Sequence, residues 1–123
     1  MEKTFAERRA HPRYSVKNNI LLYNEITFAE IFNISKGGVC CRFIIESKEQ
    51  HTACTTVDLL NTADKFYIQQ LSCRDLNCHE LSAVDITPVS AVIRDCRLQF
   101  LDLDDIQKKL LESFIELAAT DQD

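Results

Sequence analysis

The chain has 123 residues and a formal charge of −5, and 46% of its residues are hydrophobic. This length suits one domain whose core forms without metal or disulfide staples. The acidic balance argues against a surface that binds nucleic acid throughout. No apolar run approaches the roughly 18 residues of a membrane helix, and residues 1–10 are too charged for a signal peptide. We therefore expect a cytoplasmic protein with a single domain (1–123) and no membrane insertion.

Basic residues are concentrated in the N-terminal segment. Residues 1–17 contain five Lys or Arg against two Glu, although the whole chain is acidic. Such a segment suits a compact anion, because it attracts the anion locally while the acidic body repels long polyanions. We expect residues 1–13 to form a flexible basic arm. The charge alone is explained equally well if this terminus is simply solvated and binds nothing.

Strand-like segments follow the arm. The clearest alternation places Val39, Cys41 and Phe43 on one face, as in a half-buried antiparallel strand, with Cys40 and Arg42 on the other. The other segments of β-type composition are residues 14–23, 26–34, 52–60, 65–73, 89–94 and 97–101. We expect these segments to build a β-barrel over residues 14–101.

The spacing becomes helical from Asp102, and we expect a helix over residues 102–119, capped by Asp102 or Asp104. One apolar stripe consists of Leu103, Ile106, Leu110, Phe114 and Leu117. A second group widens the apolar arc to about half of the circumference; its members are Leu111, Ile115 and Ala118. This width exceeds what one packed surface requires and favours a second contact, such as a homodimer through the helix. Strands followed by a single helix suggest a small antiparallel barrel.

We expect the six cysteines to be reduced thiols. No export signal accompanies them, and Cys40 and Cys41 are adjacent, so they lie on opposite faces of any strand. Cys73, Cys78 and His79 form a cluster, but a closed zinc site needs four ligands at tighter paired spacings. The sequence therefore predicts ordinary packing of the thiols and no metal site.

Both glycines of the chain, Gly37 and Gly38, are neighbours. A chain that uses glycine only here is expected to need positive φ, or the close approach of a ligand to bare backbone, at this point. Just before them, Asn33 and Ser35 are two positions apart, so their polar side chains share one face of extended backbone. The segment is therefore a candidate for reading the edge of a base.

Three guanidinium groups lie close together in the arm, those of Arg8, Arg9 and Arg13. Pro12 biases His11 towards extended backbone, so we do not expect this segment inside a helix. Guanidinium groups pair in bidentate fashion with phosphate and with the O6 and N7 edge of guanine. The arginines are therefore candidates for binding a guanine nucleotide.

The two groups of polar residues form a recognisable pair of motifs. They read Arg9-x-x-x-Arg13, preceded by Arg8, and Asn33-x-Ser35-x-x-Gly38. This pair resembles the signature of PilZ domains, bacterial receptors for cyclic di-GMP. Residues 36–43 and 93–103 also look like the third strand and the final strand of that family.

The resemblance covers the chain from Glu7 to about Leu117. It implies a six-stranded antiparallel β-barrel with a C-terminal helix and no catalytic centre. The sequence also contains no nucleophile elbow, P-loop or dinucleotide fingerprint. We therefore do not expect an enzyme, and we expect no cofactor.

By the resemblance, the ligand-binding residues are Arg8, Arg9, Arg13, Asn33, Ser35 and Gly38. The two motif arginines would clasp guanine bases and phosphates, the amide and the hydroxyl would bind a guanine edge, and the second-motif glycine would leave room for the ligand. Arg8 matches a residue of members that hold a stacked pair of ligands, so one or two cyclic di-GMP per site are implied. Gly37 and Arg97 are additional candidates. Arg97 stands where many members have glycine, and whether it contacts phosphate or intrudes on the ligand is left open.

In this family, ligand binding orders the arginine-bearing arm over the barrel and exposes or creates a surface for an effector protein. The resemblance therefore predicts a cyclic di-GMP receptor that signals to a protein partner. A ligand-independent PilZ-like adaptor that has lost nucleotide binding is the alternative. A binder of single-stranded nucleic acid through the arm is disfavoured by the acidic body and the absence of Trp.

Overall fold

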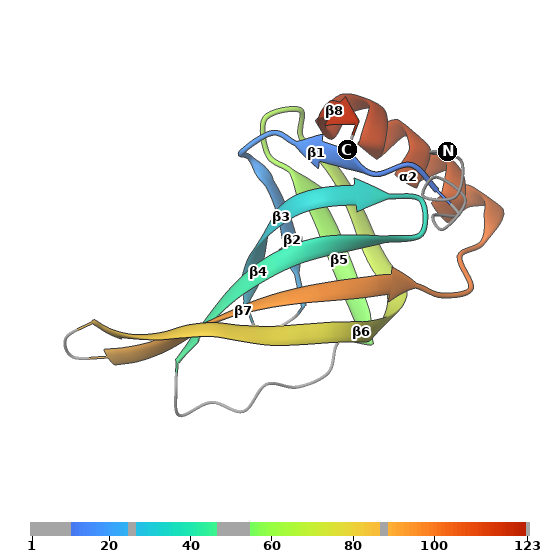
Figure 1. The fold of residues 1–123 in the computed structure, drawn as a ribbon. Helices are drawn as coiled ribbons and strands as arrows, with labels where there is room; N and C mark the ends of the chain where they lie inside the picture. Colours follow the sequence, from blue (N-terminus) through green and yellow to red (C-terminus); the bar gives the residue numbers. More distant parts are fainter. Residues whose placement is uncertain (1–10, 25–26, 47–54, 87–88, 123) are drawn as a thin grey trace, which may run out of the picture.

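The computed structural model describes residues 11–24, 27–46, 55–86 and 89–122, which form eight strands and one helix (Figure 1). The elements are β1 (Tyr14–Val16), β2 (Ile20–Tyr23), β3 (Phe28–Ser35), β4 (Gly38–Glu46), β5 (Thr56–Asn61), β6 (Phe66–Ile86), β7 (Val89–Phe100), α2 (Asp105–Ala118) and β8 (Ala119–Gln122). Of the predicted basic arm, only His11 to Arg13 falls within the described residues.

Six of the strands close into an antiparallel barrel. Their order is β2-β5-β6-β7-β4-β3, and the pairing of β2 with β3 closes the ring. β1 pairs with the end of β3, and β8 pairs in turn with β1, so these two short strands extend the sheet. Figure 1 shows α2 at one end of the barrel, beside β1 and β8, and the paired ends of β6 and β7 projecting at the other. The predicted six-stranded antiparallel barrel with a C-terminal helix is confirmed.

Several strands differ in extent from the predicted segments. Residues 14–23 form two strands, because β1 pairs with the end of β3 and β2 pairs with its start. Residues 65–73 are only the beginning of β6, which continues to Ile86 because β7 pairs along it. The segments 89–94 and 97–101 belong largely to one strand, β7.

Alternate side chains of the strands fill the barrel. In β4, Val39, Cys41 and Phe43 are buried as predicted, whereas Cys40 and Arg42 are half-buried. The Arg42 guanidinium donates two hydrogen bonds to the Asp95 carboxylate, at 2.8 and 3.2 Å, and these raise the pKa of Arg42. The fully buried side chains of the core include Phe43, Phe114, Ile20, Leu22, Ile34, Leu59, Leu71, Leu98 and Leu111.

The helix α2 begins at one of the two predicted caps. The Asp104 carboxylate accepts a hydrogen bond of 2.7 Å from the Gln107 N–H, and the Gln107 side chain accepts one of 3.1 Å from the Asp104 N–H. These reciprocal bonds form a capping box. Further along α2, the Phe114 ring meets the Phe66 ring of β6 edge to face, with centroids 5.7 Å apart. The capping box thus fixes where the helix begins, and the ring contact packs its centre on the barrel.

Only part of the wide apolar arc of α2 is buried against the barrel. Its buried residues are Leu111, Phe114, Ile115 and Ala118. By contrast, Ile106, Leu110 and Leu117 are 71%, 39% and 42% exposed. The barrel therefore packs against one part of the wide apolar arc, and these three residues of the stripe lie outside that contact. A homodimer through the exposed half stays a prediction.

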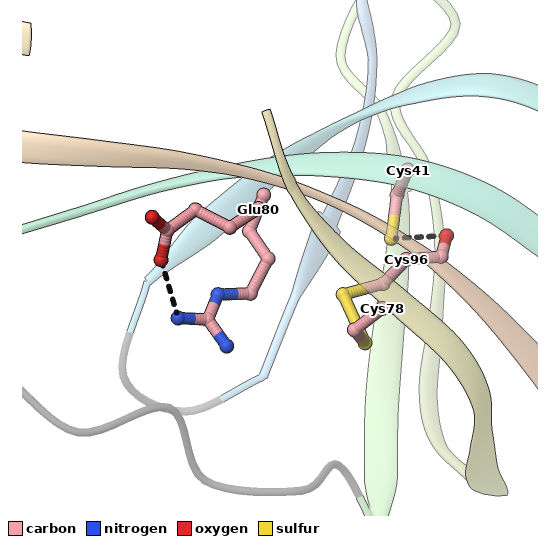
Figure 2. The surroundings of a disulfide bond; sticks show 5 residues. Cys41, Cys78, Glu80 and Cys96 are labelled. Carbon is pink, nitrogen blue, oxygen red and sulfur yellow. Dashed lines mark hydrogen bonds and ion pairs between the residues drawn. A yellow bond between two sulfur atoms is a disulfide. The ribbon is translucent and has the colours of Figure 1, made fainter. Parts of the chain in front are cut away.

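A disulfide joins β6 to β7 (Figure 2). Cys78 and Cys96 lie directly opposite each other in the antiparallel pair, with Cα atoms 4.1 Å apart. The expectation of six reduced thiols is therefore wrong for this pair, because the register brings together two cysteines 18 positions apart. Cys40, Cys41 and Cys73 are thiols. The Cys41 thiol donates a long hydrogen bond, 3.8 Å, to the Cys96 carbonyl oxygen.

Reduction of this disulfide is expected to destabilise the protein. A cross-link over a loop of this size restricts the unfolded chain and stabilises the folded state by about 3 kcal/mol. Dithiothreitol should therefore lower the urea midpoint, measured by circular dichroism. The reductant should not change the midpoint of Cys78→Ser, whereas the control Cys40→Ser should respond as the wild type does. A wild-type midpoint that is the same with and without reductant would contradict the pairing.

Candidate functional site

The turn between β3 and β4 is tied to the end of β7. Lys36 and Gly37 connect Ser35 to its strand partner Gly38. The Gly37 N–H donates a hydrogen bond of 3.1 Å to the Ser35 hydroxyl oxygen. The Gly37 carbonyl accepts one of 2.9 Å from the Phe100 N–H. The position of the turn is therefore fixed both internally and against β7.

The close approach of two backbones requires glycine at position 38. A Cβ there would overlap the Leu98 carbonyl oxygen of β7 and would lie 3.2 Å from the Gln99 Cα. Neither glycine has a positive φ, so the first of the two expected reasons for glycine here is wrong. At Gly37 the nearest atoms to an added Cβ belong to side chains, with His11 Cδ2 at 3.0 Å. Gly38 therefore lets β4 and β7 approach, while Gly37 lies next to the arm.

The end of the arm runs beside the turn. β1 pairs antiparallel with β3, with Ser15 opposite Asn33. Continuing this register by two residues places Arg13 opposite Ser35. His11, two residues earlier, lies next to the turn at its glycine. The fold thus brings the last arginine of the first motif to the second motif.

A cavity of about 710 Å³ opens at this junction. The predicted site residues that line it are Arg13, Asn33, Ser35, Gly37, Gly38 and Arg97. Arg8 and Arg9 lie outside the described residues. The volume falls within the range of about 300–1,000 Å³ that is typical of sites for small molecules.

The polar groups of β3 are arranged along one side of this cavity. Asn33 and Ser35 line it, while Ile34 between them is fully buried in the core. The Ser35 oxygen already accepts the Gly37 N–H, so its hydroxyl proton is directed elsewhere and can be donated to a ligand. The Asn33 amide supplies both donors and an acceptor. This edge can therefore form hydrogen bonds of either polarity.

Positive charge gathers around the cavity, although the chain is acidic. The charged residues that line it are Arg13, Lys36, Arg97, Lys108, Asp102 and Glu112. The Lys36 ammonium lies 3.5 Å from the Glu112 carboxylate, and about half of each side chain is exposed. Four cations against two carboxylates leave a local positive surplus, which favours an anionic ligand.

Several lining residues were not found by sequence reasoning. They include His11 of the arm, Leu76 of β6, Asp102 and Leu103 before α2, and Lys108, Leu111 and Glu112 of α2. These residues come from segments far apart in sequence, and no local pattern marks them as neighbours. A second cavity, of about 580 Å³, lies between the arm and α2 and shares His11, Lys36 and Glu112 with the first.

Comparisons with known proteins identify the fold. No family model and no curated protein matches the sequence. Among solved structures, the PilZ domain of YcgR from Escherichia coli with c-di-GMP (cyclic di-GMP) aligns with a TM-score of 0.63 at 12% identity, covering 89% of this chain and 90% of that chain. The chain has the fold of PilZ domains.

Longer PilZ-containing structures align as well. The K. pneumonia MrkH complex with c-di-GMP gives a TM-score of 0.59 at 14% identity, over 89% of this chain and 51% of that chain. The complex of Escherichia coli YcgR with c-di-GMP gives 0.55 at 11% identity, over 89% of this chain and 45% of that chain. The present chain thus corresponds to about half of these proteins.

Two further features, a membrane-spanning helix and a metal cluster, are absent from the described residues. No helix among the described residues has the length and apolar character needed to cross a membrane. Within those residues there is also no group of three or more His, Cys, Asp or Glu side chains arranged to hold a metal ion.

The two glycines of the turn are expected to differ sharply in their tolerance of alanine. Gly38→Ala should destabilise the protein by about 1–3 kcal/mol, because its Cβ meets backbone atoms of β7 that cannot move independently. Gly37→Ala should cost less, since the flexible His11 side chain can shift. Urea unfolding of both variants measures the difference. Equal losses of stability would contradict the close approach at Gly38.

Proposed function

We propose that the protein is a non-catalytic receptor for cyclic di-GMP. The observation that carries this proposal is the cavity at the β3–β4 turn, where Arg13, Asn33, Ser35 and Gly38 line one space. These residues come from both halves of the paired motif. Solved structures with the same fold are described with c-di-GMP, and this supports the choice of ligand.

The charge of the cavity suits this ligand. Cyclic di-GMP carries two phosphodiester charges, and the described lining has two more cations than carboxylates. A compact dianion can use this surplus, whereas a long polyanion would extend over the acidic remainder of the chain. The match supports a small cyclic dinucleotide over single-stranded nucleic acid.

In the proposed complex, each polar group has a distinct task. The Arg13 guanidinium pairs with a guanine edge or a phosphate through its fork of donors. Asn33 and Ser35 bind a second guanine edge by hydrogen bonds. Arg97 lines the same cavity and adds a phosphate contact. Gly37 gives the ligand access to the backbone of the turn.

The remaining arginines of the motif act through the arm. Arg8 and Arg9 precede the segment that lies beside the turn, and we propose that ligand binding orders them over the cavity. Fixing backbone costs about 1–2 kcal/mol per residue, which limits the net affinity. The contribution of Arg8 decides whether one ligand or a stacked pair is bound. The ordered arm then signals to an effector protein.

A ligand-independent adaptor is the second candidate. It is favoured by the exposed apolar residues Ile106, Leu110 and Leu117 on the outer side of α2, since such a patch suits a protein contact. The two candidates differ in what removal of a site arginine does. If the protein is an adaptor, the Arg13→Ala variant should bind the partner as well as the wild type does. If the protein is a receptor, the variant should lose its response to the nucleotide.

Calorimetric titration of the full chain with cyclic di-GMP tests the receptor function. We expect saturable binding, and Arg13→Ala should weaken it about 10- to 100-fold because a bidentate contact is lost. Lys17→Ala removes an exposed charge of the same sign outside the cavity and serves as the control. GMP and cyclic AMP should give no saturable heat. Absence of wild-type binding to cyclic di-GMP would falsify the proposal.

A thermal shift provides an independent measurement. Ligand that binds only the folded state stabilises it by about 2.7 kcal/mol at a hundredfold excess over the dissociation constant. The melting temperature should therefore rise with cyclic di-GMP concentration in the wild type. At the same ligand concentration the stabilisation of Arg13→Ala should fall to about 0.4–1.4 kcal/mol, because its dissociation constant is 10- to 100-fold higher, so its melting temperature should rise less than that of the wild type.

A further inference from the structure

One side of α2 forms a wall of the candidate cavity. Lys108, Leu111 and Glu112 all line it, and their spacing of three and four residues places them on one side of a helix. We propose that this side of α2 is part of the cyclic di-GMP site: Lys108 contacts a ligand phosphate, and Glu112 opposes binding by holding Lys36. The inference rests on the proposed function and assigns two residues outside the paired motif.

The backbone of Lys108 is held in a fixed position. The Lys108 N–H donates a hydrogen bond of 3.0 Å to the Asp104 carbonyl, within the capped first turn of α2. The Gln107 side chain reaches the Gln70 carbonyl of β6 at 3.4 Å, which ties this turn to the barrel. A lysine that extends from fixed backbone at the edge of a cavity can reach a ligand without reorganising the helix.

The ammonium group of Lys108 is available for a ligand. Across the described part of the chain, Lys108 takes part in no ion pair, and the nearby Glu112 is paired with Lys36 at 3.5 Å. Lys108 also shares the cavity with Arg13 and Arg97, and the four cations of the described lining exceed its two carboxylates, Asp102 and Glu112. Lysine binds phosphate as a point charge, and an anionic ligand would relieve this surplus.

Glu112 has the opposite effect on an anionic ligand. Its carboxylate lines the cavity and holds Lys36 of the turn. A dianion that enters the cavity is repelled by Glu112 and competes with it for Lys36. Because both side chains of the pair are about half exposed, the pair is weak, and the ligand can displace it. Removing the carboxylate should therefore improve binding.

The first part of the test compares two neighbouring lysines of α2. Lys108 lines the cavity, whereas Lys109 lines only the second cavity. In titrations of the full chain with cyclic di-GMP, Lys108→Gln should weaken binding about tenfold. It should also reduce the dependence of affinity on salt, because one fewer charge meets the ligand. Lys109→Gln should stay within about twofold of the wild type.

The second part of the test concerns Glu112, whose substitution should change the affinity for cyclic di-GMP in the opposite direction. Glu112→Gln should tighten binding about two- to fivefold, the range expected of a half-exposed ion pair. Glu116→Gln is the matched control, because Glu116 is also on α2 but lines only the second cavity. The melting temperatures of the ligand-free variants should match that of the wild type, which separates a ligand contact from a structural role.

The outcomes distinguish this inference from the receptor function. If Arg13→Ala weakens binding but Lys108→Gln keeps the wild-type affinity, Lys108 makes no phosphate contact, and the inference fails while the receptor function stands. If Glu112→Gln keeps the wild-type affinity, the opposing role of Glu112 is overturned in the same way. Equal losses in Lys108→Gln and Lys109→Gln would show a general effect of charge and would also overturn the inference. If the wild type does not bind cyclic di-GMP, the proposed function and this inference fail together.

Discussion

The close approach of β4 to β7 at Gly38 is the constraint on which the candidate site depends. Without a side chain at this position, the backbone of β4 lies directly against the Leu98 carbonyl of β7. Two residues further along β7, the Phe100 N–H holds the carbonyl of Gly37. The chain then leaves β7, turns at Asp102 with a φ of 50°, and enters α2. The turn, the end of β7 and the helix thus meet around one cavity.

Local patterns predicted much of this arrangement. The alternation of β4, the polar pair of Asn33 and Ser35 and the capping aspartate before α2 each depend on near neighbours in sequence, and the structure has them as expected. The glycine pair indicated a special backbone position, but positive φ, the first of the two expected reasons for it, was wrong. Bare backbone is needed there for contact with β7, and that contact is invisible until the two strands are paired.

Features that depend on distant contacts could not be predicted in the same way. The disulfide requires the register of β6 against β7, and that register shifts near Leu76 and again near Leu81, on either side of Cys78. The spacing of the cysteines in sequence therefore does not reveal that they face each other. Similarly, the side of α2 that packs on the barrel depends on the contact between Phe114 and Phe66. A wide apolar arc alone permits more than one orientation of the helix about its axis.

In this orientation, α2 presents two chemically different sides. The residues at its cavity side are charged, with Lys108 and Glu112, whereas Ile106, Leu110 and Leu117 are exposed and apolar elsewhere on the helix. The ion pair between Lys36 and Glu112 connects the first side to the turn. A ligand that takes Lys36 from Glu112 changes a contact of the same rigid helix that presents the apolar residues. A shared element whose position both sites bias is one physical basis for coupling between two sites. In this fold, α2 both lines the proposed ligand site and carries the exposed apolar residues.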